Sequence, residues 1–297
     1  MPTAAMGQYF TLCTPEKTGV EAWQSLWVVR AGGPMIKNGA IPKYVQRPCS
    51  LANASRVEHY MLLRNPYERL LSGYLDVVAR QTHHHVPLRM ARSLEPACTP
   101  QCCGRVGCPR KFNATPAGFA EFVRELVELT RANRSIGNGW ANMHLRPIAM
   151  SNCQKLADRA KRVVQLKLEL QEYWYDRFLS RIGAQTAARD GRWPSGCFWR
   201  NPAVAAVNGS GTCGSSRSVA GAACHGHASC SSGRSGSCSK MAAFYSEETA
   251  ALVTEYSQAD LDRYDYPAWS PSADKPLPEG CTGVVETSLD PLIGGSP

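Results

Sequence analysis

The sequence lacks four features that would place it in a familiar class. No apolar run approaches the roughly 18 residues that a membrane-spanning helix needs, and the opening MPTAAMGQYF has neither the basic nor the apolar region of a signal peptide. The phosphate-binding pattern G-x-x-x-x-G-K-[ST] is absent, and aromatic residues are not interspersed among long basic runs. We therefore expect no membrane span in this chain, and we favour neither a nucleotide-dependent kinase nor a nucleic-acid-binding protein.

The balance of charge favours an anionic partner. The 297 residues include 33 Lys and Arg against 24 Asp and Glu, which gives a net charge of +9. Such an excess attracts nucleotides, acidic glycans, nucleic acids or membrane surfaces. Hydrophobic residues make up 43% of the chain, enough for a sizeable core.

Cysteines and glycosylation sequons indicate an oxidising compartment. Thirteen cysteines are many for a cytosolic enzyme of this length and suggest several disulfides, whose pairing the sequence leaves open. The odd count leaves at least one thiol unpaired. Four N-x-[ST] sequons, at Asn53, Asn113, Asn133 and Asn208, favour a luminal or secreted protein.

Short apolar runs alternate with amphipathic segments, which predicts a parallel sheet with helices on its faces. Pro66 and Pro116 suit the first position of a helix, and Ser246 followed by two glutamates suits a helix start. The helix opening at Thr115 is expected to bury Phe119, Phe122, Val123, Leu126 and Val127. The predicted strands are 9–14, 60–63 and 162–169, and the other predicted helices are 20–30, 67–80, 171–182 and one opening at 246.

Two irregular stretches interrupt this alternation. Residues 81–115 contain His83 to His85 and four cysteines, and residues 183–242 are rich in Gly, Ser, Ala and Cys. We interpret both as insertions in one domain that spans 1–269, followed by a flexible tail over 270–297. Their Cys/His groups do not match paired C-x2-C zinc knuckles, so we favour disulfides and expect no metal.

Two strand–turn–helix units have the chemistry to bind phosphate. The first turn contains Lys17, Thr18 and Gly19, where backbone N–H groups, a hydroxyl and a point charge converge on one position. In the second, Arg64 follows a strand and can donate two hydrogen bonds to a phosphate, and Ser72 lies two helical turns beyond Pro66. The first turn alone is equally typical of an ordinary solvated turn, and Arg64 alone is more typical of a surface arginine in a strand-to-helix turn.

Together the two units resemble the Golgi carbohydrate sulfotransferases, the group that contains chondroitin and HNK-1 sulfotransferases. The motif Arg64-Asn-Pro-Tyr-Glu-Arg-Leu-Leu-Ser72 is the most specific match. The matches keep the family's order over residues 9–180 and 243–267. Further similar segments are Ala117 to Phe122, His144-Leu-Arg-Pro147 with Cys153, Val163 to Glu169, and Asp260 to Tyr266.

The resemblance implies a P-loop-like sulfotransferase fold and the donor 3′-phosphoadenosine-5′-phosphosulfate (PAPS). Lys17, Thr18 and Gly19 would hold the 5′-phosphosulfate, and Arg64 with Ser72 would hold the 3′-phosphate. His144 is the expected base for a carbohydrate hydroxyl, since imidazole titrates near neutral pH, and Glu169 is a lesser candidate. The family resides in the Golgi lumen, and its usual membrane anchor is not found in this chain. An acidic glycan is a possible acceptor, with Arg146, Arg159, Lys161 and Arg162 as candidate contacts.

The first turn departs from the family pattern. Glu16 precedes the lysine where the family usually has Pro, and Val20 and Glu21 replace hydroxyl residues; Leu145 replaces a Trp. A carboxylate beside a phosphosulfate would repel it. These departures leave open an alternative, a secreted Cys-rich glycan-binding protein built on an impaired sulfotransferase scaffold.

Overall fold

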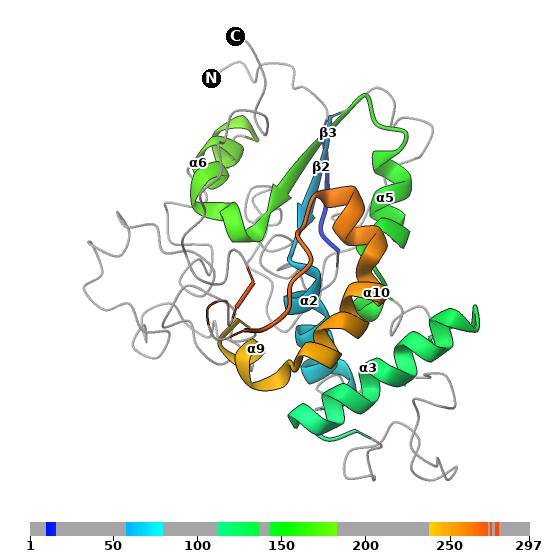
Figure 1. Ribbon diagram of the computed structural model, residues 1–297. Coiled ribbons are helices and arrows are strands. Elements are labelled where there is room, and N and C mark those ends of the chain that lie inside the picture. The colour runs from blue at the N-terminus through cyan, green and yellow to red at the C-terminus, as the bar shows by residue number, and fades with distance from the viewer. Residues whose placement is uncertain are drawn as a thin grey trace, which may run out of the picture.

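A parallel β-sheet with helices on both faces forms the centre of the protein (Figure 1). The structure is a computed structural model and describes residues 10–15, 58–79, 112–136, 143–182, 238–272, 274, 277 and 278. Within these ranges the sheet has three strands in the order β1-β2-β3, all parallel. The predicted three-layer α/β class is therefore confirmed.

The strands are β1 (Phe10–Cys13), β2 (Glu58–Leu63) and β3 (Arg162–Lys167). Cys13 lies opposite Met61, and Leu63 lies opposite Lys167. Because the strands are parallel, the turns that follow them leave the sheet at the same edge.

Side chains of β2 alternate between two hydrophobic clusters, one on each face of the sheet. Tyr60 and Leu62 pack with Leu166 against helix α6 (Gln171–Arg181). Met61 and Leu63 belong to the larger cluster on the opposite face. Figure 1 shows α6 on one side of the strands and α5 and α10 on the other.

The larger cluster is covered by the remaining helices, and it is rich in aromatic rings. Tyr67 contacts Tyr245 and Trp269 edge to face, and Phe119 contacts Tyr74 and Tyr245. The helices on this face are α2 (Pro66–Gly73), a π-helix η2 (Tyr74–Ala79), α3 (Pro116–Arg131), η3 (Ile148–Met150), α5 (Asn152–Ala157), α9 (Cys238–Phe244) and α10 (Glu247–Tyr264).

The predicted helix starts are confirmed. Pro66 and Pro116 begin α2 and α3, and the Thr115 side chain accepts a hydrogen bond from Gly118 N–H at 3.1 Å. Ser246 accepts from Thr249 N–H at 3.1 Å and so caps α10. The five residues predicted for the inner face of α3 are all buried.

Two element boundaries differ from the prediction. The α-helix expected over 67–80 ends at Gly73 and continues as the π-helix η2. Gly73, the last residue of α2, lies in tight contact with the His144 segment, because a Cβ on Gly73 would lie 2.9 Å from the carbonyl oxygen of His144. The strand expected to reach Glu169 ends at Lys167, where the chain enters the 3₁₀ turn η4 (Leu168–Leu170).

Parts of the predicted insertions and tail belong to the folded core. Phe112 and Met241, at the ends of the two predicted insertions, are buried in the larger cluster, and Leu277 of the predicted tail packs against it. Residues 81–111 and 183–237 of the insertions, and the helix predicted over 20–30, lie outside the described residues.

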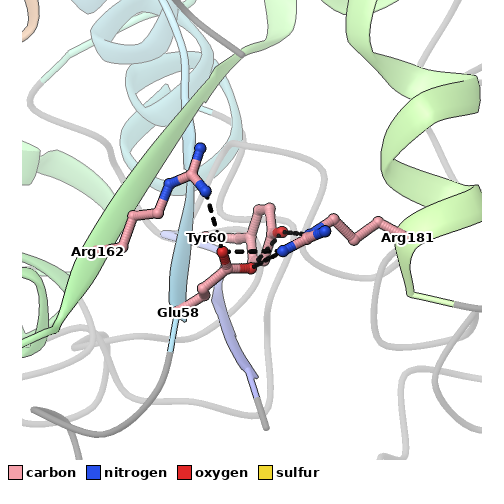
Figure 2. A network of polar contacts seen from close by, with 4 residues as sticks. All are labelled: Glu58, Tyr60, Arg162 and Arg181. Atoms are coloured by element: carbon pink, nitrogen blue, oxygen red, sulfur yellow. Dashed lines mark hydrogen bonds and ion pairs between the residues drawn. The ribbon is translucent and has the colours of Figure 1, made fainter. Parts of the chain in front are cut away.

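Two connections hold the sheet to its helices. A disulfide joins Cys13 at the end of β1 to Cys153 in α5. Near the start of β2, the Glu58 carboxylate accepts hydrogen bonds from Tyr60, Arg162 and Arg181, so it links β2 to β3 and to the end of α6 (Figure 2).

No helix within the described ranges is long and apolar enough to cross a bilayer.

Candidate functional site

The candidate site lies where β2 and β3 end, at the carboxyl edge of the sheet. Ligands of open α/β sheets bind outside this edge, because the loops that follow adjacent strands meet there. Arg64 and Asn65 follow β2, and Leu168 to Leu170 follow β3. The turn after β1 begins with Thr14 and Pro15 at the same edge.

Asn65 shapes the turn that carries Arg64. Its side-chain oxygen accepts hydrogen bonds from Tyr67 N–H at 3.0 Å and Glu68 N–H at 3.4 Å, so Asn65 caps α2. Pro66 at the first helical position needs no hydrogen-bond acceptor. The cap fixes the direction in which the chain leaves β2, and with it the position of Arg64.

Arg64 is buried and ion-paired. Its Nη2 lies 2.7 Å from Glu68 Oε1, and the side chain is 8% exposed. Burial alone would lower the pKa of Arg64, but the Glu68 carboxylate raises it above the ordinary value. The guanidinium therefore stays charged at the edge of the sheet.

Glu169 is the second carboxylate beside Arg64, and it bridges two distant segments. One oxygen accepts a short hydrogen bond from Asn65 N–H, and the other accepts from the Tyr266 hydroxyl at 3.1 Å. Burial, reinforced by the Glu68 carboxylate, raises the pKa of Glu169 to about 7, although Asn65 N–H and Arg64 oppose the rise. This group can therefore gain or lose a proton near neutral pH.

Lys167 and Tyr266 lie beside the charged residues Arg64, Glu68 and Glu169. The ammonium of Lys167 lies 4.4 Å from the centre of the Tyr266 ring and donates to the carbonyl of Asp265 at 2.8 Å. A cation over an aromatic face is attracted to it. The chain just after α10 is thereby held against the end of β3.

Ser72 lies on the same side of α2 as the Arg64–Glu68 pair. It follows Glu68 by four residues within one helix, which places the two side chains on one face. Ser72 is partly exposed, unlike most residues of α2. The spacing thus places Ser72 on the face of α2 that carries Glu68, the ion-pair partner of Arg64, while a shared role of Arg64 and Ser72 stays a prediction.

The segment that carries His144 packs against the end of α2. Arg69 donates to the carbonyl of Arg146 at 2.8 Å and to that of Met143 at 3.2 Å, and Tyr256 donates to the carbonyl of Leu145 at 3.2 Å. His144 itself is 3% exposed. Its backbone thus adjoins the helix of Ser72, while its role as a base stays a prediction.

The residues predicted to hold the 5′-phosphosulfate lie outside the described residues. These are Lys17, Thr18 and Gly19. The neighbouring Glu16 and Glu21, which depart from the family pattern, also lie outside the described residues. The described range that contains β1 ends at Pro15, which is buried.

The candidate glycan-contacting cations are separated from this edge. Arg162 begins β3, at the opposite end from Lys167, and pairs with Glu58 at 3.3 Å (Figure 2). Arg159 and Lys161 precede it in the chain and are exposed. Only Arg146, beside the His144 segment, adjoins α2.

Sequence reasoning missed Asn65 and Tyr266 as members of the site. A signal for Asn65 was present, since Asn before Pro and an apolar helical segment is a typical helix cap. Tyr266 was noted only as part of the segment Asp260 to Tyr266. Within the described ranges, no three Cys, His, Asp or Glu side chains are grouped to hold a metal ion.

Comparison with known proteins identifies one family. The family model described as "Sulfotransferase family" matches residues 13–172, more than half of the 297 residues. The matched region begins at Cys13, the last residue of β1, and contains β2, β3 and the turn of Arg64. No curated protein and no solved structure matches this chain.

Proposed function

Because the chain belongs to the sulfotransferase family, we propose that it transfers a sulfuryl group from PAPS to a hydroxyl of a carbohydrate. One observation carries the proposal: the charged, buried Arg64 lies in a capped turn at the carboxyl edge of a parallel sheet. The turn that contains Lys17 begins at this same edge. We propose that both turns bind phosphate, which suits a donor with phosphates at both ends of one nucleoside.

The two turns divide the donor between them. Arg64 would bind the 3′-phosphate by charge-assisted hydrogen bonds, with Ser72 donating its hydroxyl from the same side of α2. Lys17, Thr18 and Gly19 would bind the 5′-phosphosulfate. Arg64 pairs with Glu68 in the present structure, so the incoming phosphate shares the guanidinium with this carboxylate.

The proposed reaction is an in-line displacement at sulfur. A bond forms between the acceptor oxygen and sulfur while the bond from sulfur to the 5′-phosphate oxygen breaks. Lys17 would stabilise the charge that develops on the departing phosphate, because such charge stabilisation supplies much of the rate in this type of transfer. His144 is our candidate to accept the proton of the acceptor hydroxyl.

The acceptor class and the compartment are part of the proposal. The motifs resemble those of the chondroitin and HNK-1 group, and the net charge of +9 suits an acidic glycan. The Cys13–Cys153 disulfide supports an oxidising compartment, as does the exposure of the sequon residues Asn113 and Asn133. We therefore propose that the protein acts in the Golgi lumen or elsewhere in the secretory pathway.

The test measures transfer of radiolabel from PAPS to a panel of desulfated polysaccharides. We expect the wild type to label at least one polysaccharide, and Lys17→Ala or Arg64→Ala to reduce labelling at least 100-fold, typical for loss of a charge-stabilising group. Arg124→Ala is the matched control, because Arg124 is 50% exposed and pairs only with Glu248 among the described ion pairs. It should retain full activity.

Two outcomes would contradict the proposal. Full activity in both Lys17→Ala and Arg64→Ala would show that the site is elsewhere. Calorimetry with 3′-phosphoadenosine-5′-phosphate (PAP) covers the other case: a protein that binds polysaccharide but not PAP is the glycan-binding alternative rather than an enzyme.

A further inference from the structure

Glu169 joins three segments that are far apart in the sequence. Its carboxylate accepts from the backbone of Asn65, 104 residues earlier, and from Tyr266, 97 residues later. Asn65 is at once the residue after Arg64 and the cap of α2. The orientation of the Arg64 turn therefore depends on Glu169 as well as on the local cap.

Resting on the proposed function, we propose that Glu169 is a positioning residue of the donor site, which fixes the Arg64 turn for the 3′-phosphate and takes up a proton when that phosphate binds. The acceptor oxygens of Glu169 are both engaged, one by the turn and one by Tyr266. A carboxylate held in this way orients the turn rather than removing a proton from an acceptor hydroxyl.

Charge explains why a proton accompanies the ligand. Arg64 and Glu68 face Glu169 from the turn and α2, Tyr266 faces it from the segment after α10, and the Lys167 ammonium lies over the Tyr266 ring. The pair Glu68 and Arg64 is close to neutral, so an added phosphate dianion meets the Glu169 carboxylate as an uncompensated like charge.

Protonation removes this repulsion without loss of the hydrogen bond. A protonated carboxyl keeps one oxygen that accepts from Asn65 N–H. Because the pKa of Glu169 is already near 7 before ligand binds, a nearby phosphate raises it further and the proton is bound at neutral pH. The affinity for PAP must then fall as the pH rises above 7.

The experiment is a calorimetric titration of the full chain with PAP between pH 6.5 and 8.5. For the wild type we expect Kd to increase three- to tenfold per pH unit above pH 7, since one proton contributes at most a factor of ten. Repeating the titration in buffers of different ionisation enthalpy should reveal uptake of part of a proton near pH 7.5. Adenosine 5′-phosphate, which lacks the 3′-phosphate, should show neither effect.

Glu169→Gln keeps an oxygen for Asn65 N–H but cannot ionise. We expect it to bind PAP with a Kd that stays constant between pH 7 and 8.5. Glu255→Gln is the matched control. Glu255 lies on α10, is 45% exposed and pairs with Arg131 of α3, so it belongs to an exposed ion pair. It should keep the wild-type pH profile.

Tyr266→Phe gives a second variant should Glu169→Gln fail to fold. It removes a donor that stabilises the ionised carboxylate, so the pH at which the affinity begins to fall should move upward. If the wild type binds PAP with no dependence on pH and no proton uptake, the role of Glu169 is refuted while the proposed function stands. If the wild type does not bind PAP at any pH, the proposed function itself fails.

Discussion

The charge of the buried Arg64 side chain is compensated by neighbouring carboxylates. Removing a guanidinium from water is costly unless carboxylates compensate it. Glu68 compensates Arg64 at 2.7 Å, and Glu169 lies nearby. Two carboxylates around one cation are more than neutrality requires, and this excess adds to the larger effect of burial in raising the pKa of Glu169 to about 7.

This excess predicts a pH-dependent stability. Because the pKa of Glu169 is raised from 4.5 to about 7 in the folded protein, its proton stabilises the fold below pH 4.5, and this contribution is lost as the pH rises to 7. Glu169→Gln cannot lose a proton. We therefore compare the free energy of unfolding of Glu169→Gln with that of the wild type at each pH. The difference, variant minus wild type, should be about 1–3 kcal/mol larger at pH 8 than at pH 5.

Urea denaturation at both pH values measures this difference. Glu255→Gln is again the control: the hydrogen bond from Arg131 lowers the pKa of Glu255, so its contribution changes only at lower pH. An identical change of stability in the wild type and in Glu169→Gln would contradict the assignment of the shifted pKa.

Helix α2 is the element that organises the site. Its cap, Asn65, orients the Arg64 turn. Arg69 donates a hydrogen bond to the backbone of the His144 segment, and Gly73, which has no side chain, allows that segment to lie directly against the helix. One side of a helix of eight residues thus connects the predicted 3′-phosphate site to the predicted base.

The cap of α2 can be tested separately from helix stability in general. Asn65→Ala removes the side chain that accepts from Tyr67 and Glu68 N–H, and should lower the free energy of unfolding by about 1 kcal/mol. Because the cap positions Arg64, the variant should also bind PAP at least fivefold more weakly.

Ser246→Ala is the control, since Ser246 caps α10 in the same way. It should lose similar stability yet bind PAP as the wild type does. Equal loss of PAP affinity in both variants would mean that the cap of α2 has no particular link to the site. Urea denaturation and calorimetry supply the two readouts.

At the scale of the molecule, the disulfide fixes the sheet edge to the helical layer. Cys13 ends β1, just before the turn predicted to bind the 5′-phosphosulfate, and its partner Cys153 lies in α5, 140 residues later. Closing so long a loop in the unfolded chain stabilises the folded state, by about 4–5 kcal/mol in the chain-entropy account.

Removal of this disulfide should therefore be costly. The double variant Cys13→Ala with Cys153→Ala should unfold about 3–5 kcal/mol more easily than the wild type in urea. Trapping thiols in the cell, followed by digestion without reductant and mass spectrometry, should recover the two linked peptides. Recovery of both cysteines as free thiols would contradict the pairing and the proposed oxidising compartment.

The local features of the fold were predictable from the amino-acid sequence. Pro66, Thr115 and Ser246 mark helix starts because caps and first-turn prolines act within one turn of the chain. The apolar spacing of α3 and the alternation of strands with helices indicated the three layers, and the motif from Arg64 to Ser72 indicated the family.

The contacts between distant segments were not predictable from the sequence and emerged from the folded chain. The partner of Cys13 among thirteen cysteines and the bridge of Glu169 from Asn65 to Tyr266 depend on which turns meet at the sheet edge, and no local pattern encodes this. The same holds for the close approach of the His144 backbone to Gly73 at the end of α2. Burial by residues from elsewhere in the chain also gave Glu169 its raised pKa, because desolvation is a property of the folded molecule.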